Sequence, residues 1–223
     1  MMTNLFSIFD PSTPGFLSSN WLSSFIFVLL VPMTLWNLYA RPHKLTNLVS
    51  NYISMEFKPL IKKSPFMLIM PITLFTLIAY NNAMGLIPYI FTSPSQLIFT
   101  VALALPLWLA SVTYGWLNNT SNTLVHLIPQ STPTLLMPFM VLIETVSNLI
   151  RPLTLAVRLS ANMIAGHLLI VLLNSADPVS PMPALPVLFV AKIMLVTLET
   201  AIAFIQAYVF SVLITLYAAE STN

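Results

Sequence analysis

Apolar residues in this chain gather into runs long enough to cross a lipid bilayer. A membrane-spanning helix needs about 20 predominantly apolar residues. Runs of this length cover 21–40, 65–87 and 95–117. Aromatic side chains stand near both ends of the first run, and Pro65 suits the first turn of the second. The pattern therefore predicts three upright transmembrane helices.

Two later runs are much longer than an upright crossing requires. They cover 132–173 and 183–220 and contain only a few ionisable residues. Pro138 and Pro152 in the first of these runs favour a kinked or strongly tilted helix. The proline-rich stretch at the junction of the two runs favours a turn, so the two helices are expected to form a long hairpin.

The segment 43–63 has a different pattern, in which apolar and polar residues alternate with helical spacing. Lys44, Asn47, Asn51, Lys58 and Lys62 occupy much of the polar face. The apolar positions are Leu45, Leu48, Val49, Tyr52, Ile53, Phe57, Leu60 and Ile61. This pattern predicts an amphipathic helix that lies on the membrane surface between two spans.

Composition places the whole chain in the membrane. Hydrophobic residues make up 57% of the 223 residues and charged residues 6%, whereas an ordinary soluble domain is about 25% charged. No charged residue occurs between Lys63 and Glu144. A soluble protein with so large an apolar core would need polar helix faces to cover it, and the sequence lacks them. The predicted fold class is therefore all-α, a polytopic membrane protein with a single domain over 1–223 and an N-terminal segment over 1–20.

The distribution of the basic residues predicts the orientation of this domain. Five of the eight Lys and Arg residues lie in the segment 41–63, which favours the inner side of the membrane for that segment. The N-terminus would then lie outside and the C-terminus inside. The net charge of +2 gives no sign of nucleic-acid binding.

The two long helices carry ionisable residues inside the membrane, and such residues are functional candidates by default. Glu144, Arg151 and Arg158 are spaced by seven and lie near one helical stripe, and Asn162 extends this stripe by one turn. His167 lies on roughly the opposite face, about 13 Å further along the helix.

On the last helix, Lys192, Glu199 and Gln206 are again spaced by seven, and Glu220 lies at the end. In a hairpin, His167 could meet Glu199. Imidazole and a desolvated carboxyl are suited to proton transfer, whereas an Arg keeps its proton and acts as a fixed charge.

Structural roles are alternatives for several of these residues. Arg158 could pair with a carboxylate for assembly, and His167 could be a packed helix residue. A structural role is favoured for Arg151, because Pro152 marks a local break, and Lys192 is expected to snorkel toward the interface. His126 is expected to be structural.

Other kinds of site have no signature in the sequence. It contains no cysteine, no cluster of His and carboxylates with metal-ligand spacing and no Gly-rich phosphate loop. We therefore expect no metal and no cofactor.

The stretches "IETVSNLIRPLTLAVRLSANMIAGHLL" and "LETAIAFIQAYVF" closely resemble the subunit a family of rotary ATP synthases, in its mitochondrial form. "NNAMGLIPY" and "HLIPQSTP" are further similar segments, and the resemblance covers nearly the whole chain in order. It implies a stator subunit of a membrane proton channel beside a rotating ring of c subunits. It also implies an interfacial helix, upright helices and a strongly tilted C-terminal hairpin.

The resemblance also implies roles for individual residues. Arg158 matches the essential arginine, which faces the c-ring carboxylates and stops protons leaking between two offset half-channels. His167 and Glu199 match the pair that lines the half-channel from the intermembrane space, and Asn162 and Gln206 match polar positions near the arginine. The acidic positions toward the matrix half-channel are matched by Glu144 and Glu220. Lys192 matches no family motif; it could snorkel or tune the charge of Glu199.

Partners and location follow from the same resemblance. The expected partners are the c-ring, the peripheral stalk b subunit, subunit 8, other small membrane subunits, protons and the lipid bilayer. The expected location is the mitochondrial inner membrane, with the N-terminus toward the intermembrane space and the C-terminus toward the matrix. The ATP chemistry would then lie on other subunits.

Two other function classes compete with this one. A proton-coupled secondary transporter or antiporter-like subunit would share the intramembrane Glu, Lys and His. It should, however, bind substrate at broken helices near the midplane and would usually show an internal repeat, which this sequence lacks. A membrane scaffold without transport would not need an aligned stripe of Glu, Arg and Asn.

Overall fold

The structure is a computed structural model of the chain. It describes residues 5–12, 19–26, 28, 41–61, 65–118, 120–128, 133, 136–177 and 181–222. The described residues form helices and their connections, without strands. The predicted all-α class is confirmed. Most of the predicted span 21–40 lies outside the described residues, and its first residues belong to a short 3₁₀ helix, Ser19–Phe25.

The helices follow the predicted order along the chain. A 3₁₀ helix at Leu5–Phe9 comes first. The α-helices are α2 (Arg41–Phe57), α3 (Ile69–Gly85), α4 (Leu97–Asn118), α5 (Thr120–His126), α6 (Met137–Ala176) and α7 (Leu185–Thr222). Further 3₁₀ turns occur at Pro65–Leu68, Ser93–Ser95 and Met182–Ala184. Helices α4, α6 and α7 are each long and apolar enough to cross a membrane.

Helix α3 reaches the length of a membrane crossing only with the turn before it. Its 17 residues extend about 26 Å, less than the roughly 30 Å of a hydrocarbon core. The 3₁₀ turn Pro65–Leu68 continues the helix at its start and adds about 8 Å. A helical segment therefore covers most of the predicted span 65–87 and ends at Gly85, and its crossing of the membrane stays a prediction.

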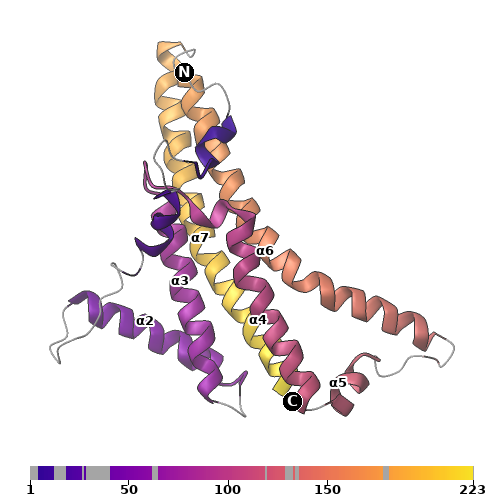
Figure 1. The fold of residues 1–223 in the computed structure, drawn as a ribbon. Helices are drawn as coiled ribbons and strands as arrows, with labels where there is room; N and C mark the ends of the chain where they lie inside the picture. The colour runs from indigo at the N-terminus through magenta and orange to yellow at the C-terminus, as the bar shows by residue number, and fades with distance from the viewer. Residues whose placement is uncertain are drawn as a thin grey trace.

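The lengths of α6 and α7 force a tilted hairpin. They contain 40 and 38 residues, which correspond to about 60 Å and 57 Å, roughly twice the thickness of the hydrocarbon core. Figure 1 shows the last part of α6 running beside α7 and the first part splayed away from it. Pro152 lies inside α6, where it has no backbone N–H to donate to the helix.

Helix α7 is the central element of the bundle, because it packs against α3, α4 and α6. The shared core is formed by Leu74, Ile78, Ala79, Ala104, Leu155, Ala156, Leu159, Ala207 and Phe210. Small residues in it let the helices approach closely, as membrane helices commonly do. The buried Asn82 side chain of α3 donates a hydrogen bond to the Ala203 carbonyl of α7 over 3.2 Å. This bond joins the two helices near the middle of α7.

Helix α2 runs across the direction of the bundle at its lower end in Figure 1. Its inner face buries Ile53 and Phe57, and the Phe57 ring stacks on Tyr208 of α7 with 6.3 Å between centroids. The Tyr208 hydroxyl also donates to Glu56 over 3.1 Å. An amphipathic helix over this segment is therefore confirmed, whereas its contact with the membrane surface stays a prediction.

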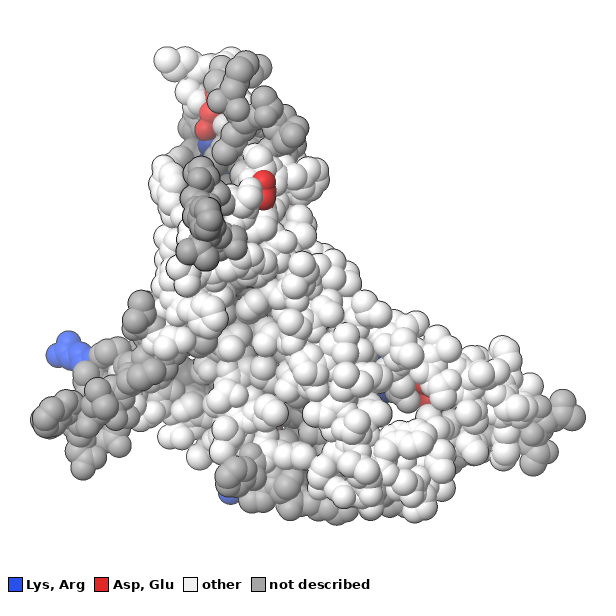
Figure 2. Space-filling model, viewed as in Figure 1, with Lys and Arg blue, Asp and Glu red and all other residues white. Residues whose placement is uncertain are grey.

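Charged side chains are sparse over the surface seen in Figure 2, whose broad middle is uncharged. Figure 1 places the Leu5–Phe9 segment and the tip of the hairpin toward one end of the molecule. The end of α7 and α2 lie toward the other. This arrangement agrees with a polytopic protein whose two ends face different compartments.

Candidate functional site

Arg158 lies on the exposed side of α6, opposite the side that packs into the bundle. Leu155 and Leu159, its neighbours on the buried side, are 5% and 2% exposed. Arg158 itself lines a shallow surface hollow with Leu153, Thr154 and Val157. No described residue forms an ion pair or hydrogen bond with its guanidinium. The alternative in which Arg158 pairs with a carboxylate of its own chain therefore has no support within the described residues.

A second cationic residue, Arg151, joins the two acidic residues near the other end of the hairpin. Its guanidinium lies 3.4 Å from a Glu144 oxygen and 3.1 Å from a Glu220 oxygen. Its central carbon also lies 5.6 Å from the centre of the Tyr217 ring. Arg151 thus joins α6 to α7 through Glu220 and contacts Glu144 one heptad earlier on its own helix. The sequence placed Arg151 on one helical stripe with Glu144 and favoured a structural role for it, whereas its contact with Glu220 was not predicted.

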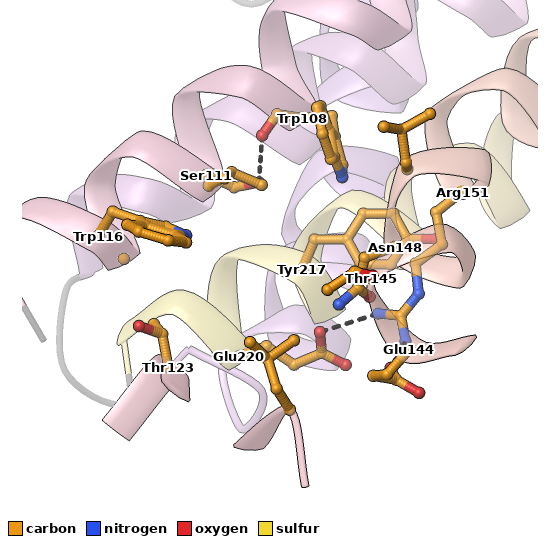
Figure 3. Close-up of a pocket in the computed structure, with 14 residues that line it drawn as sticks. Trp108, Ser111, Trp116, Thr123, Glu144, Thr145, Asn148, Arg151, Tyr217 and Glu220 are labelled. Carbon is orange, nitrogen blue, oxygen red and sulfur yellow. Dashed lines mark hydrogen bonds and ion pairs between the residues drawn. The ribbon is translucent and has the colours of Figure 1, made fainter. Parts of the chain in front are cut away.

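This cluster lines a cavity of about 490 Å³ between α4, α5, α6 and α7. Figure 3 shows Arg151, Glu144 and Glu220 on one side of it and Trp108, Ser111 and Trp116 of α4 on another. The cavity exists because the first part of α6 diverges from α7 and α4. A space of this size holds on the order of ten water molecules, so a hydrated path can reach both carboxylates.

His167 and Glu199 form a second, separate group of ionisable residues. The Glu199 residue is 7% exposed, and neither carboxyl oxygen has a hydrogen-bond partner among the described residues. The same holds for Nε2 of His167. The Glu199 carboxyl lies against Gly166, the residue before His167, and the predicted meeting of the two side chains stays a prediction. No direct hydrogen bond joins the two side chains within the described part of the chain.

Gly166 is the residue that lets Glu199 approach α6 so closely, and the sequence analysis did not single it out. A Cβ added at this position would lie 2.8 Å from Cδ and 3.0 Å from Cγ of Glu199. A side chain here would force the Glu199 carboxyl to move away from α6. The signal in the sequence was a glycine in the interior of a long helix, directly before a histidine.

The remaining candidate residues are placed as follows. Asn162 and Gln206 are half-buried on α6 and α7, and their side-chain amides make no hydrogen bond within the described structure. Lys192 forms an ion pair with Asp177 across the tip of the hairpin. The ammonium group of Lys192 therefore interacts with Asp177. No contact between Lys192 and Glu199 is seen among the described residues, so the hypothesis that Lys192 tunes the charge of Glu199 has no structural support.

No metal site accompanies these groups in the described part of the chain, because no three His, Asp or Glu residues gather there as ligands. The ionisable residues instead occupy three positions along α6. The Arg151 cluster lies about 10 Å before Arg158 along the helix axis, and His167 lies about 13 Å after it.

Comparison with known proteins identifies the family. The family model described as ATP synthase A chain matches residues 17–219. This chain belongs to the ATP synthase A chain family. It is 52% identical to ATP synthase subunit a of Drosophila simulans over 225 residues, with 99% of each chain covered. It is 53% identical to the subunit a of Anopheles quadrimaculatus and 50% identical to that of Locusta migratoria, again over 99% of each chain.

Membership of the ATP synthase A chain family makes the Gly166 contact testable by proton transport. Gly166→Ala should displace the Glu199 carboxyl from α6 and strongly reduce passive proton conduction by the membrane sector. Combining it with Glu199→Asp shortens the acid by one methylene and should restore part of the conduction. Ala165→Ser, a change on the exposed neighbour, is the matched control. Conduction by Gly166→Ala equal to that of the control would contradict the contact.

The Arg151 cluster gives a second prediction. Arg151→Ala leaves two carboxylates without their shared cation and should lower conduction by up to about fivefold, the equilibrium factor that corresponds to the ~1 kcal/mol upper end for exposed ion pairs. Arg151→Lys should restore only part of it, because a single ammonium lacks the planar fork that reaches both acids. Asn148→Ala, which changes another residue of the same cavity, is the control. Losses from Arg151→Ala and Glu144→Gln that simply add in the double variant would argue against a coupled cluster.

Proposed function

We propose that this chain is the stator subunit of the membrane proton channel of an ATP synthase, with two offset half-channels separated by Arg158. The observation that carries the proposal is the order of charges along α6. An exposed guanidinium, without a partner among the described residues, stands between the cavity of about 490 Å³ at Arg151 and the His167–Glu199 group. Because 16 residues separate Arg151 from His167, the two groups are about 24 Å apart along the helix, most of the thickness of a bilayer core.

The first half-channel admits protons from the intermembrane space through His167 and Glu199, with Asn162 and Gln206 as polar neighbours nearer the arginine. Imidazole can accept a proton at one nitrogen and release one at the other near neutral pH. Glu199 can take and return a proton through either oxygen. Neither side chain is committed to a hydrogen bond with another described residue, so both are available for transfer to water or to a partner.

The second half-channel releases protons to the matrix through the cavity that contains Glu144 and Glu220. Arg151 interacts with both acids over 3.1–3.4 Å and holds their carboxyl groups at the cavity. In this position they can receive a proton from the membrane interior and pass it to water in the cavity.

Arg158 keeps the two half-channels apart. A guanidinium does not give up its proton in a protein, so no proton can be relayed through it. Its position on the exposed surface of α6 fits a partner that brings a carboxylate from outside the chain, namely the c-ring. A c-ring carboxylate passes Arg158 in the ionised form, and it crosses the lipid only after it has been neutralised by a proton.

Partners and orientation complete the proposal. The chain assembles with the c-ring, the peripheral stalk b subunit, subunit 8 and other small membrane subunits in the mitochondrial inner membrane. Its N-terminal segment faces the intermembrane space and its C-terminus the matrix. The secondary-transporter alternative gains no support, because α6 and α7 run without interruption over Met137–Ala176 and Leu185–Thr222, and a transporter site would be built on broken helices.

The test of this proposal is the removal of the Arg158 charge. Arg158→Ala should abolish coupled ATP synthesis in the assembled enzyme, because the barrier between the half-channels is lost. Arg158→Lys should fail as well, since an ammonium lacks the planar fork and can lose its proton when desolvated. ATP synthesis and passive proton conduction are measured in parallel, with Thr154→Ala in the same surface hollow as the control. Normal synthesis by either assembled Arg158 variant would remove the role assigned here.

A further inference from the structure

The N-terminal 3₁₀ helix, Leu5–Phe9, contacts the candidate proton-transfer group directly, although no role has been assigned to it so far. The Phe9 ring meets the His167 ring nearly at a right angle, with 6.4 Å between centroids and an interplanar angle of 80°. Edge-to-face pairs in this distance range are attractive and prefer a defined orientation. Phe9 therefore covers one side of the imidazole and restricts its orientation.

A second contact holds Phe9 in this position. The Gln96 side chain, directly before α4, donates a hydrogen bond to the Phe9 carbonyl over 2.5 Å. Phe9 is the last residue of its short helix, and carbonyl groups at a helix end lack partners within the helix. Gln96 supplies the missing donor across 87 residues of sequence, so the end of the N-terminal segment is tied to the connection between α3 and α4.

The next described segment docks on the same connection. The Trp21 ring meets Phe91 edge-on at 6.0 Å, and the Ser23 hydroxyl donates to the Phe91 carbonyl over 2.9 Å. Two parts of the N-terminal region are thus attached to 91–96, close to where that connection approaches α6. The contact between Phe9 and His167 is one of several that fix this region against the bundle.

Asp10 follows Phe9 and is exposed. Hydrogen bonds from Ser12, including the bond from its backbone N–H to the carboxylate over 3.0 Å, hold the pKa of Asp10 below its ordinary value. A permanent negative charge therefore stands one residue beyond the ring that covers His167. Such a charge raises the local concentration of cations, including hydrated protons.

We propose that Leu5–Phe9 is the outer wall of the intermembrane-space half-channel, with Phe9 as a positioning residue for His167 and Gln96 as its anchor. Phe9 shields one side of the imidazole from bulk water and directs its exchange toward Glu199, while Asp10 marks the outer edge of the same wall. The inference rests on the proposed function, because it assumes that His167 exchanges protons with that compartment.

The experiment measures the access of water-soluble reagents to position 167. The chain contains no cysteine, so His167→Cys introduces the only thiol of this subunit. A positively charged, membrane-impermeant methanethiosulfonate reagent is applied to each side of membrane vesicles that contain the assembled ATP synthase. The labelling rate of the subunit is compared between the His167→Cys background and the same background with Phe9→Ala.

We expect Phe9→Ala to raise the labelling rate severalfold from one side only, because the wall has been removed. Phe9→Tyr, which keeps the ring, should leave the rate low. Phe6→Ala is the matched control: Phe6 belongs to the same short helix but is 67% exposed, and its loss should not change the rate. Gln96→Ala removes the hydrogen bond to the Phe9 carbonyl and leaves the Phe9 ring unchanged. Its labelling rate therefore provides an independent test if the Phe9→Ala enzyme does not assemble.

Two outcomes would overturn the inference, and they are distinguishable. Equal labelling with and without the Phe9 ring, and in Gln96→Ala, would show that the segment is no wall and would leave the half-channel proposal intact. No labelling from either side in any background would remove the aqueous path to position 167, and with it both proposals. With His167 present, Phe9→Ala should also change the rate of passive proton conduction while ATP synthesis remains coupled to proton flow, and Phe6→Ala should change neither.

Discussion

A permanent positive charge on the outer surface of a membrane helix is the constraint on which the remaining structure depends. Hydrocarbon cannot solvate a guanidinium, and a central Arg costs about 2.5–3.5 kcal/mol even on insertion scales. Arg158 has no partner among the described residues, which is why we propose a partner from outside the chain. A partner bound permanently in a desolvated pair would block a rotary motor. The exposed position of Arg158 on α6 is compatible with a partner that arrives and leaves.

The excess length of α6 and α7 gives this charge its surroundings. Two helices of about 60 Å can place three groups of polar residues at different depths while remaining continuous. The first part of α6 splays away from α7, and Glu144, Arg151 and Glu220 line the cavity between these helices and α4 and α5. On the other side of Arg158 along α6, the two helices lie close together, because Gly166 lets the Glu199 carboxyl of α7 lie directly against α6. One end of the hairpin therefore borders an open cavity, and at the other end an acid and an imidazole lie close to the contact between α6 and α7.

The periodicity of the chain was sufficient to predict the fold class and most of the helices. Runs of apolar residues are long and unambiguous in a membrane protein, and α3, α4, α6 and α7 begin and end within five residues of the predicted limits. The residues of the candidate site were accessible to the same analysis, because ionisable groups are rare in such a sequence. The contact between Arg151 and Glu220 could not be predicted, because spacing along α6 relates Arg151 to Glu144 but gives no information about which residue of α7 lies nearby. Gly166 and Phe9 each contact a residue that is far away in the sequence. Such contacts cannot be predicted from the local sequence pattern.

The most direct measurement of the central claim is whether the surface around Arg158 meets the carboxylate of a c subunit. Thr154 lies one turn from Arg158 in the same surface hollow, and Thr154→Cys would introduce the only cysteine of the chain. In the assembled enzyme, mild oxidation should form a disulfide between this residue and a cysteine placed next to the mid-membrane carboxyl of the c subunit. A cysteine at the exposed Lys44 of α2 should form none. A cross-link at Thr154→Cys that blocks proton-driven rotation is the result expected here, and its absence in an assembled, active enzyme would contradict the placement of Arg158 against the ring.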